Sequence, residues 1–190
     1  GEKFEGNPVS LKIIYNQYYK DKYSAYFEGT RINNSNPKTF KVLGRNFSKD
    51  KNNVYYLGKK ITGANSKTFR VLGFKYAKDK NNIYYSNRKI IGADLSTFQI
   101  GSDGFSKDKN NVYEGNEKID GADAKTFEVI DAYAGFARDK NYLYHSNERI
   151  KNSDPYTFER VNEHLVRDKN QFYSNDGTVL NVDGKSFQIV

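Results

Sequence analysis

A repeat of 29 residues constrains the fold of this chain more than any other feature of its sequence. The pair Asp-Lys recurs six times, at a step of 29 residues in every interval except the fourth, which is 31. A Phe follows each Asp by nineteen positions. These anchors are Asp21, Asp50, Asp79, Asp108, Asp139 and Asp168, with Phe40, Phe69, Phe98, Phe127, Phe158 and Phe187. Because one unit of this size cannot bury its apolar face alone, the period predicts a stack of small units.

The period also predicts the domain organisation. Residues 1–190 form a single repeat domain with six hairpin repeats, since no Pro/Gly/Ser-rich linker interrupts the pattern. The two extra residues of the long interval lie between Phe127 and Asp139. A partial unit is expected at the N-terminus, because the segment from Asn7 to Leu11 matches the segment from Asn36 to Phe40.

Each unit is predicted to be all-β, with three short strands and three turns. A hairpin spans the Asp-Lys pair, where strand formers flank a turn whose Asp accepts hydrogen bonds from backbone amides. A second turn is expected at Gly58-Lys59 and its equivalents. A bend at Gly63-Ala64-Asn65 follows, with the Asn side chain capping a short helical turn, and the third strand starts at Thr68-Phe69.

An open stack is favoured over a closed propeller. A propeller blade of four strands needs about 40 residues or more, and this unit is shorter. The chain also begins and ends with the same half of the repeat, whereas a ring closed by its termini would need complementary halves.

Composition excludes several classes of site. The chain has no Cys, so it holds neither disulfides nor thiolate metal ligands. No run is apolar and long enough for a membrane span or a signal peptide.

The repeat motifs resemble a known family. DKNNVYY at 50–56, DKNNIYY at 79–85 and GADAKTF at 121–127 are similar to the DKNYY family, a bacterial tandem-repeat family of uncharacterised function. The resemblance covers essentially the whole chain. It implies a bacterial repeat protein, but it carries over no catalytic residue and no ligand.

No residue pattern commits the chain to catalysis, a metal or a cofactor. His145 and His164 occupy different places in the repeat and lack a repeated carboxylate partner. The Asp-x-Asn-Asn turns lack the alternating acids and closing Glu of a calcium loop. We therefore expect a protein that is not an enzyme. An enzyme would require a pocket outside the repeat, and the break near Asp131-Ala132 is where one would lie.

A basic row follows from the period. A Lys succeeds every turn Asp from the second copy onward, at Lys51, Lys80, Lys109, Lys140 and Lys169, in a chain of formal charge +8. One interpretation is attraction to a polyanion, such as nucleic acid or an anionic envelope glycan. The other is that Lys keeps hairpin tips and strand edges soluble.

A Tyr row offers a second candidate surface. Tyr26, Tyr55, Tyr84, Tyr113, Tyr144 and Tyr173 occupy one repeat position in all six copies, and the next position varies. Since neighbours in a strand face opposite sides, the constant Tyr is expected inside and the varying residue in solvent. Phe27, Tyr56 and Tyr85 would then form an exposed aromatic cluster able to stack on sugars or on a partner protein.

The sequence thus predicts a binding or scaffold module at the bacterial cell envelope that recognises an anionic glycan or another polyanion. The alternative is a protein-protein interaction module, such as an inhibitor or an immunity-type partner. We expect an exported or surface-associated protein. The exposed edges of an open stack also predict an end-to-end homodimer.

Overall fold

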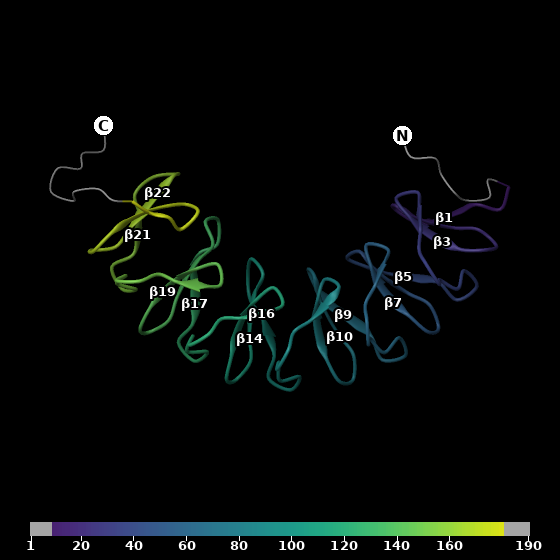
Figure 1. The fold of residues 1–190 in the computed structure, drawn as a ribbon, viewed down its shortest axis with the longest axis horizontal. Coiled ribbons are helices and arrows are strands. Elements are labelled where there is room, and N and C mark those ends of the chain that lie inside the picture. The colour runs from purple at the N-terminus through teal and green to yellow at the C-terminus, as the bar shows by residue number, and fades with distance from the viewer. Residues whose placement is uncertain (1–8, 181–190) are drawn as a thin grey trace. The chain divides into compact units, whose positions relative to one another are not determined.

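The structure, a computed structural model, describes residues 9–180. These residues form 24 short strands and no helix, so no helix of this part of the chain could cross a membrane. The strands make six four-stranded sheets in tandem, and none closes into a barrel. The chain divides into two units, residues 1–90 and 91–190, with three sheets in each (Figure 1).

In every sheet the strands pair in chain order and antiparallel, as meanders. The first unit contains β1 (Lys12–Tyr15), β2 (Tyr18–Lys20), β3 (Ala25–Phe27) and β4 (Thr30–Arg31); β5 (Lys41–Gly44), β6 (Phe47–Lys49), β7 (Val54–Tyr56) and β8 (Lys59–Lys60); β9 (Arg70–Gly73), β10 (Tyr76–Lys78), β11 (Ile83–Tyr85) and β12 (Arg88–Lys89).

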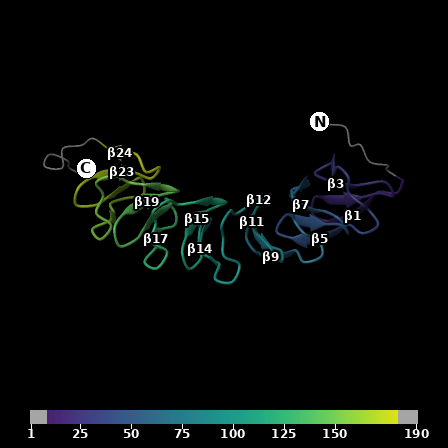
Figure 2. The same ribbon diagram turned by 60° about the horizontal axis from the view of Figure 1, so that its bottom comes forward.

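The second unit repeats this plan. It contains β13 (Gln99–Ile100), β14 (Phe105–Lys107), β15 (Val112–Glu114) and β16 (Glu117–Lys118); β17 (Glu128–Asp131), β18 (Phe136–Arg138), β19 (Leu143–His145) and β20 (Glu148–Arg149); β21 (Glu159–Arg160), β22 (Leu165–Arg167), β23 (Phe172–Ser174) and β24 (Val179–Leu180). Figure 2 shows the strands of each sheet from a second direction.

The expected all-β tandem repeat is confirmed, but each sheet has four strands instead of three. The fourth strand has only two residues, such as Lys59–Lys60 in β8, and both are exposed in the first five sheets, so it shows no periodicity in the sequence. The second turn lies one residue earlier than expected, at Leu57-Gly58, where both residues have positive φ (48° and 72°). Positive φ at both central residues is the geometry of a two-residue type I′ hairpin. Because each strand has only two to four residues, four strands fit into a unit of this length, so unit length alone does not exclude a four-stranded blade.

A sheet begins at the strand after the Phe of each repeat, so β1 supplies the first strand of a complete sheet. The partial unit expected at the N-terminus falls largely on residues 1–8, and the last Phe of the period, Phe187, falls on residues 181–190. Both lie outside the described residues.

The core of each unit lies between successive sheets. One cluster joins Val54 and Tyr56 of β7 to Ala77 of β10 and Tyr84 of β11, with Phe69 of the connecting loop between them. Tyr55 of the same β7 instead joins a cluster with residues of the preceding sheet. Alternate residues of one strand therefore face opposite sides, and both sides are covered.

Residues on the central strands are accordingly buried on both faces. Tyr55 and Val54 are fully buried, and Tyr56 is 7% exposed. Successive sheets are linked by tilted ring pairs in which Phe69 lies 5.6 Å from Phe47 and 5.7 Å from Tyr84, between ring centroids. Stacked rings in these geometries stabilise a core beyond the area they bury.

Candidate functional site

From the second copy onward, the Asp carboxylate of each Asp-Lys turn accepts hydrogen bonds from three backbone amides and one Tyr hydroxyl. Asp50 Oδ1 accepts hydrogen bonds from the amides of Asn52 and Asn53, both at 2.8 Å. Its Oδ2 accepts from the Tyr55 hydroxyl and from the Asn36 amide, both at 2.9 Å. Burial acts to raise the pKa of Asp50, but these four hydrogen bonds outweigh it and lower the pKa. The role expected for Asp as an acceptor of backbone amides is confirmed.

The same turn is tied to the bend that precedes it, which in this copy is Asn34-Ser35-Asn36 instead of Gly-Ala-Asx. The Asn36 amide belongs to that bend, and Thr39 Oγ1, also from the bend, accepts from the Lys51 amide at 3.2 Å. Equivalent bonds fix the backbone of the other turns in the basic row. The Asp-Lys turn and the bend before it thus form one hydrogen-bonded network. This network holds the backbone of each Lys in place and leaves the Lys side chain exposed.

The basic row divides into two chemically different parts. In the second unit each Lys amine pairs with an Asp of the bend: Lys109 with Asp94 at 3.1 Å, Lys140 with Asp123 at 2.8 Å, and Lys169 with Asp154. The ion pair with Lys140 lowers the pKa of Asp123. In the first unit the same bend position holds Asn36 and Asn65, which carry no charge. No carboxylate therefore neutralises Lys51 or Lys80 at this position.

The first strand of each sheet shows the same contrast. In the first unit, cross-strand partners have like charge: Lys12 faces Lys20, Lys41 faces Lys49 and Arg70 faces Lys78. In the second unit Gln99 faces Lys107, Glu128 faces Arg138, and Glu159 faces Arg167. The last two are salt bridges. Like charges directly opposite each other destabilise a sheet, and opposite charges stabilise it.

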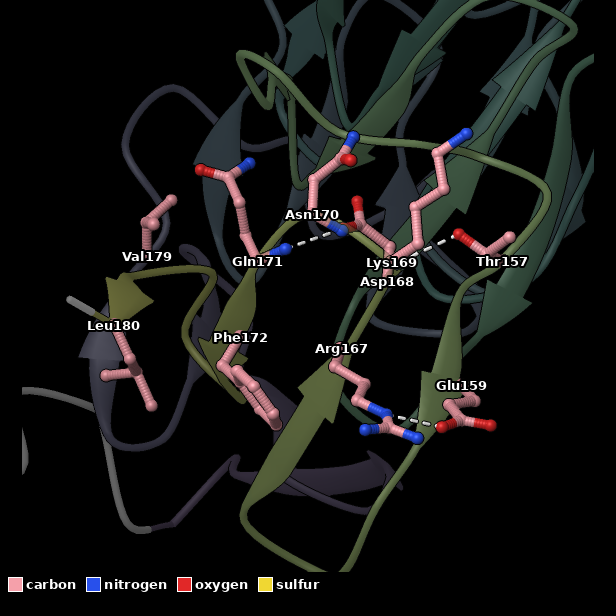
Figure 3. Close-up of a pocket in the computed structure, with 10 residues that line it drawn as sticks. All are labelled: Thr157, Glu159, Arg167, Asp168, Lys169, Asn170, Gln171, Phe172, Val179 and Leu180. Carbon is pink, nitrogen blue, oxygen red and sulfur yellow. Dashed lines mark hydrogen bonds and ion pairs between the residues drawn. The ribbon is translucent and has the colours of Figure 1, made fainter. Parts of the chain in front are cut away.

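Figure 3 shows the paired arrangement in the last sheet. Arg167 and Glu159 line a pocket of about 760 Å³ on β21 to β24 and form a salt bridge between two neighbouring strands. Lys169 lies on the same pocket with its amide bonded to Thr157. Because its charged side chains neutralise one another, this pocket offers little attraction to an ion.

The two units differ strongly in charge. Residues 1–90 contain 19 Lys and Arg against 6 Asp and Glu, a formal charge of +13. Residues 91–190 contain 12 against 17, a formal charge of −5. Between residues 9 and 90 there are four acidic residues, and three of them are the buried turn aspartates, so Glu28 is the one exposed carboxylate of this range. Every salt bridge found between residues 9 and 180 has both partners in the second unit.

Two grooves of the first unit are lined by these unpaired basic residues. One, of about 750 Å³, lies along β4 and β8 and is lined by Arg31, Lys59 and Lys60, by the carboxylate Glu28, and by polar and apolar neighbours. The other, of about 590 Å³, lies at the Asp-Lys end and is lined by Lys51, Lys60 and Lys67 with several Asn side chains. Lys60 lines both grooves, so they meet there and form one basic path.

The aromatic cluster expected in solvent is not there. Phe27 and Tyr56 are buried, 8% and 7% exposed, and Tyr85 is half-buried. Each ring packs on a ring of the neighbouring strand of its own sheet, with centroids 4.8 to 4.9 Å apart. The prediction was wrong because it assumed one solvent face, whereas the next sheet of the same unit covers the second face at Phe27 and Tyr56. The constant Tyr row is buried as expected.

The histidines and the repeat break have structural contacts. His145 is half-buried, its ring 4.9 Å from Phe136, and His164 is exposed beside Glu163. Among residues 9–180 no three His, Asp or Glu side chains gather as a metal site would require. Asp131, at the two-residue insertion, pairs with Arg160 of the next sheet.

The division of charge between the two halves was missed, although the sequence contains it. A count of charge for each half would have found it, whereas the total of +8 conceals it. The pairing of the Lys residues was also missed, because it depends on which bend residue lies beside each turn.

Fold and surface together define an all-β tandem-repeat protein with one basic unit and one charge-paired unit. The chain belongs to the DKNYY family, whose model matches residues 2–59, 18–148, 47–177 and 136–190. Comparisons with curated proteins and with solved structures found no match.

Proposed function

We propose that this chain is a non-enzymatic binding module whose first unit binds an extended polyanion. The observation that carries the proposal is the contrast at equivalent positions. Where the second unit places Asp94, Asp123, Glu128 or Glu159 beside a cation, the first unit places Asn, Lys or Arg.

The repulsion between like-charged residues on paired strands of the first unit favours ligand binding over the interpretation that these cations only keep the protein soluble. Solubility needs net charge, but it does not need Lys41 opposite Lys49, or Arg70 opposite Lys78, when the second unit pairs the same position with Glu. A like-charged cross-strand pair costs a few tenths to about 1 kcal/mol relative to a neutral one. A bound polyanion would offset this repulsion in the complex and would gain from every unpaired cation.

The ligand would follow the grooves that meet at Lys60. Arg31 and Lys59 lie on one side of this meeting point, and Lys51 and Lys67 on the other. Such a path along successive repeats suits a polymer better than a single small anion, since each repeat adds its own cations. An anionic envelope glycan and a nucleic acid both meet this charge requirement.

The test uses the full chain and two matched double variants. Lys51→Gln with Lys80→Gln removes two unpaired cations, and Lys109→Gln with Lys140→Gln removes two paired cations from the same repeat position. Binding of dextran sulfate, polyphosphate, oligothymidylate and neutral dextran would be measured by fluorescence anisotropy at about 50 and about 200 mM salt.

We expect the wild type to bind the anionic polymers, more weakly at the higher salt, and to leave neutral dextran unbound. The first double variant should lower the salt slope by about 2, because each lost contact removes about one unit. The second should behave as the wild type. Equal weakening by both variants, or no binding of any anionic polymer, would overturn the proposal.

We also infer a location outside the bacterial cell, where an anionic envelope glycan would be the ligand at hand. The support is the basic surface of the first unit, which would be attracted to an anionic envelope. Fractionation of cells that make the protein checks this, and recovery in the cytosol alone would contradict it.

A protein partner is the second candidate, favoured by the repeat break. Tyr133 of the insertion is 85% exposed and lies 5.7 Å from the guanidinium of Arg160, which Asp131 holds in place. Tyr and Arg are the residues most often found at binding hot spots. If this patch serves a protein, Tyr133→Ala should abolish that complex and leave polyanion binding unchanged.

A further inference from the structure

Phe74 combines two unfavourable features in one residue. It lies in the turn between β9 and β10, its side chain is 73% exposed, and its φ is 45°. Positive φ strains a bulky side chain, because its Cβ crowds the following carbonyl. The first sheet has Asn16 at this turn position (φ 43°) and the fourth has Asp103 (φ 49°), and these residue types tolerate the conformation best.

Neither folding nor solubility explains Phe at this position. Its ring covers no core, and an exposed Phe lowers solubility. Strain kept at a position where it does not help the fold is typical of functional sites. The side chain is therefore placed where a ligand could cover it.

The surroundings of Phe74 are basic and partly aromatic. Lys75 follows it and is exposed, and Arg45 occupies the same turn position of the preceding sheet, also exposed. Strands β5 and β9, which lead into these two turns, lie against each other. On the first sheet Tyr15 ends β1, at the start of the same turn, and is 55% exposed. Successive sheets of the first unit thus present an aromatic ring, a guanidinium and a second aromatic ring.

The exposed aromatic rings among these cations favour one kind of polyanion over the others. Phe74 has a π face and no hydrogen-bonding group, so stacking is what it can add to charge attraction. Envelope glycans and polyphosphate have no aromatic rings, and duplex nucleic acid hides the faces of its bases. A single strand exposes flat rings along its whole length, and proteins that bind single strands combine cationic paths with aromatic side chains.

We propose that the first unit binds single-stranded nucleic acid, with Phe74 and Tyr15 stacking on bases and Arg45 and Lys75 contacting phosphates. This inference rests on the proposed function, because it names the polyanion of that same basic unit.

The experiment compares three single strands of equal charge, and a duplex in which the faces of the bases are hidden. Fluorescence anisotropy of the full chain would be measured with an oligothymidylate of about 20 nucleotides, the matching oligouridylate, an abasic strand of the same length, and a duplex. Tight binding of the thymidylate or uridylate relative to the abasic strand and the duplex is expected. The two base-bearing strands distinguish DNA from RNA as the source.

Phe74→Asn is the decisive variant, because Asn fits the left-handed turn. It should raise the melting temperature while weakening thymidylate binding by about 5- to 100-fold, the loss expected for one stacked base. Binding of the abasic strand should change less than twofold. Tyr133→Ala is the matched control, since Tyr133 is also an exposed aromatic residue on the turn between the first and second strands of its sheet, but in the acidic unit.

The outcomes separate the two proposals. If the abasic strand binds as tightly as the thymidylate, or if Phe74→Asn leaves the thymidylate affinity unchanged, base stacking is excluded while polyanion binding stands. A preference for the duplex excludes it as well. If no nucleic acid binds but dextran sulfate does, the ligand is a glycan-type polymer, and if no polymer binds, both proposals fail.

Discussion

Tyr55 donates a hydrogen bond from its hydroxyl to Asp50 Oδ2 at 2.9 Å, and this bond recurs in all six sheets. The Asp directly follows one strand of the hairpin, and the Tyr lies within the next strand, five residues later. Because the Tyr ring also fills the gap to the preceding sheet, the bond couples the turn to the core. The signature of the repeat is therefore a structural device.

Removal of one such hydroxyl should destabilise the protein measurably. Tyr84→Phe deletes the bond to Asp79, 2.8 Å long, and leaves the ring in place. A hydrogen bond to a buried charged group contributes about 1.5 to 3 kcal/mol, so we expect a loss of that size in the free energy of unfolding. Urea denaturation followed by circular dichroism would measure it. An unchanged midpoint would show that water replaces the hydroxyl.

The same network predicts a loss of stability in acid. Although burial acts in the opposite direction, the hydrogen bonds made by Asp50, Asp79 and Asp108 lower their pKa values. The folded pKa then lies below the unfolded value of about 3.9. This contribution to stability is present above about pH 4 and is lost as the pH falls through the folded pKa. Melting temperatures should drop between pH 4 and pH 2, and a flat profile there would contradict this.

The stability should also fall in alkali, because the pKa of the buried Tyr is shifted in the opposite direction, upwards. Burial, with the hydrogen bond to Asp79, raises the pKa of Tyr84 to about 12, above the unfolded value of about 10. The contribution is complete below pH 10 and disappears as the pH rises towards 12. The measurement is the absorbance of tyrosinate as the pH is raised. We expect Tyr84 to ionise only as the protein unfolds.

Much of this fold was predictable because its local rules agree with its period. The Asp turn, the buried Tyr row and the tandem all-β plan follow from residue types at fixed spacing. The fourth strand did not, because two exposed residues such as Lys59 and Lys60 carry no pattern. The burial of Tyr56 did not either, since strand alternation gives the side of a residue but not whether another sheet covers that side. The hydrogen bond from the Asn36 amide to Asp50 joins residues that are fourteen positions apart in the sequence, and no local rule predicts it.

Gly177 provides a test of packing between the last two sheets. It has a φ of 81°, and a Cβ there would lie 2.4 Å from His145 Cγ. Gly121 has a similar φ of 78°, but a Cβ there meets nothing within 4 Å. Gly121→Ala should therefore cost only the left-handed strain, about 1 to 2 kcal/mol. Gly177→Ala should cost clearly more in thermal denaturation, and equal costs would show that the His145 ring moves aside easily.

The charge contrast can be tested by moving one feature between the units. Asn65→Asp gives the bend beside Lys80 the carboxylate that Asp94 provides beside Lys109. An exposed ion pair contributes about 0 to 1 kcal/mol, so the free energy of unfolding should hardly change. Affinity for an anionic polymer should nevertheless fall severalfold, because the new carboxylate neutralises Lys80 and adds an anion to the groove that Asn65 lines. The control is Asp94→Asn, which frees Lys109 in the acidic unit and should leave binding as it was. If Asn65→Asp binds as the wild type does, the first unit's unpaired Lys residues are not the ligand contacts, and the proposed surface would have to be given up.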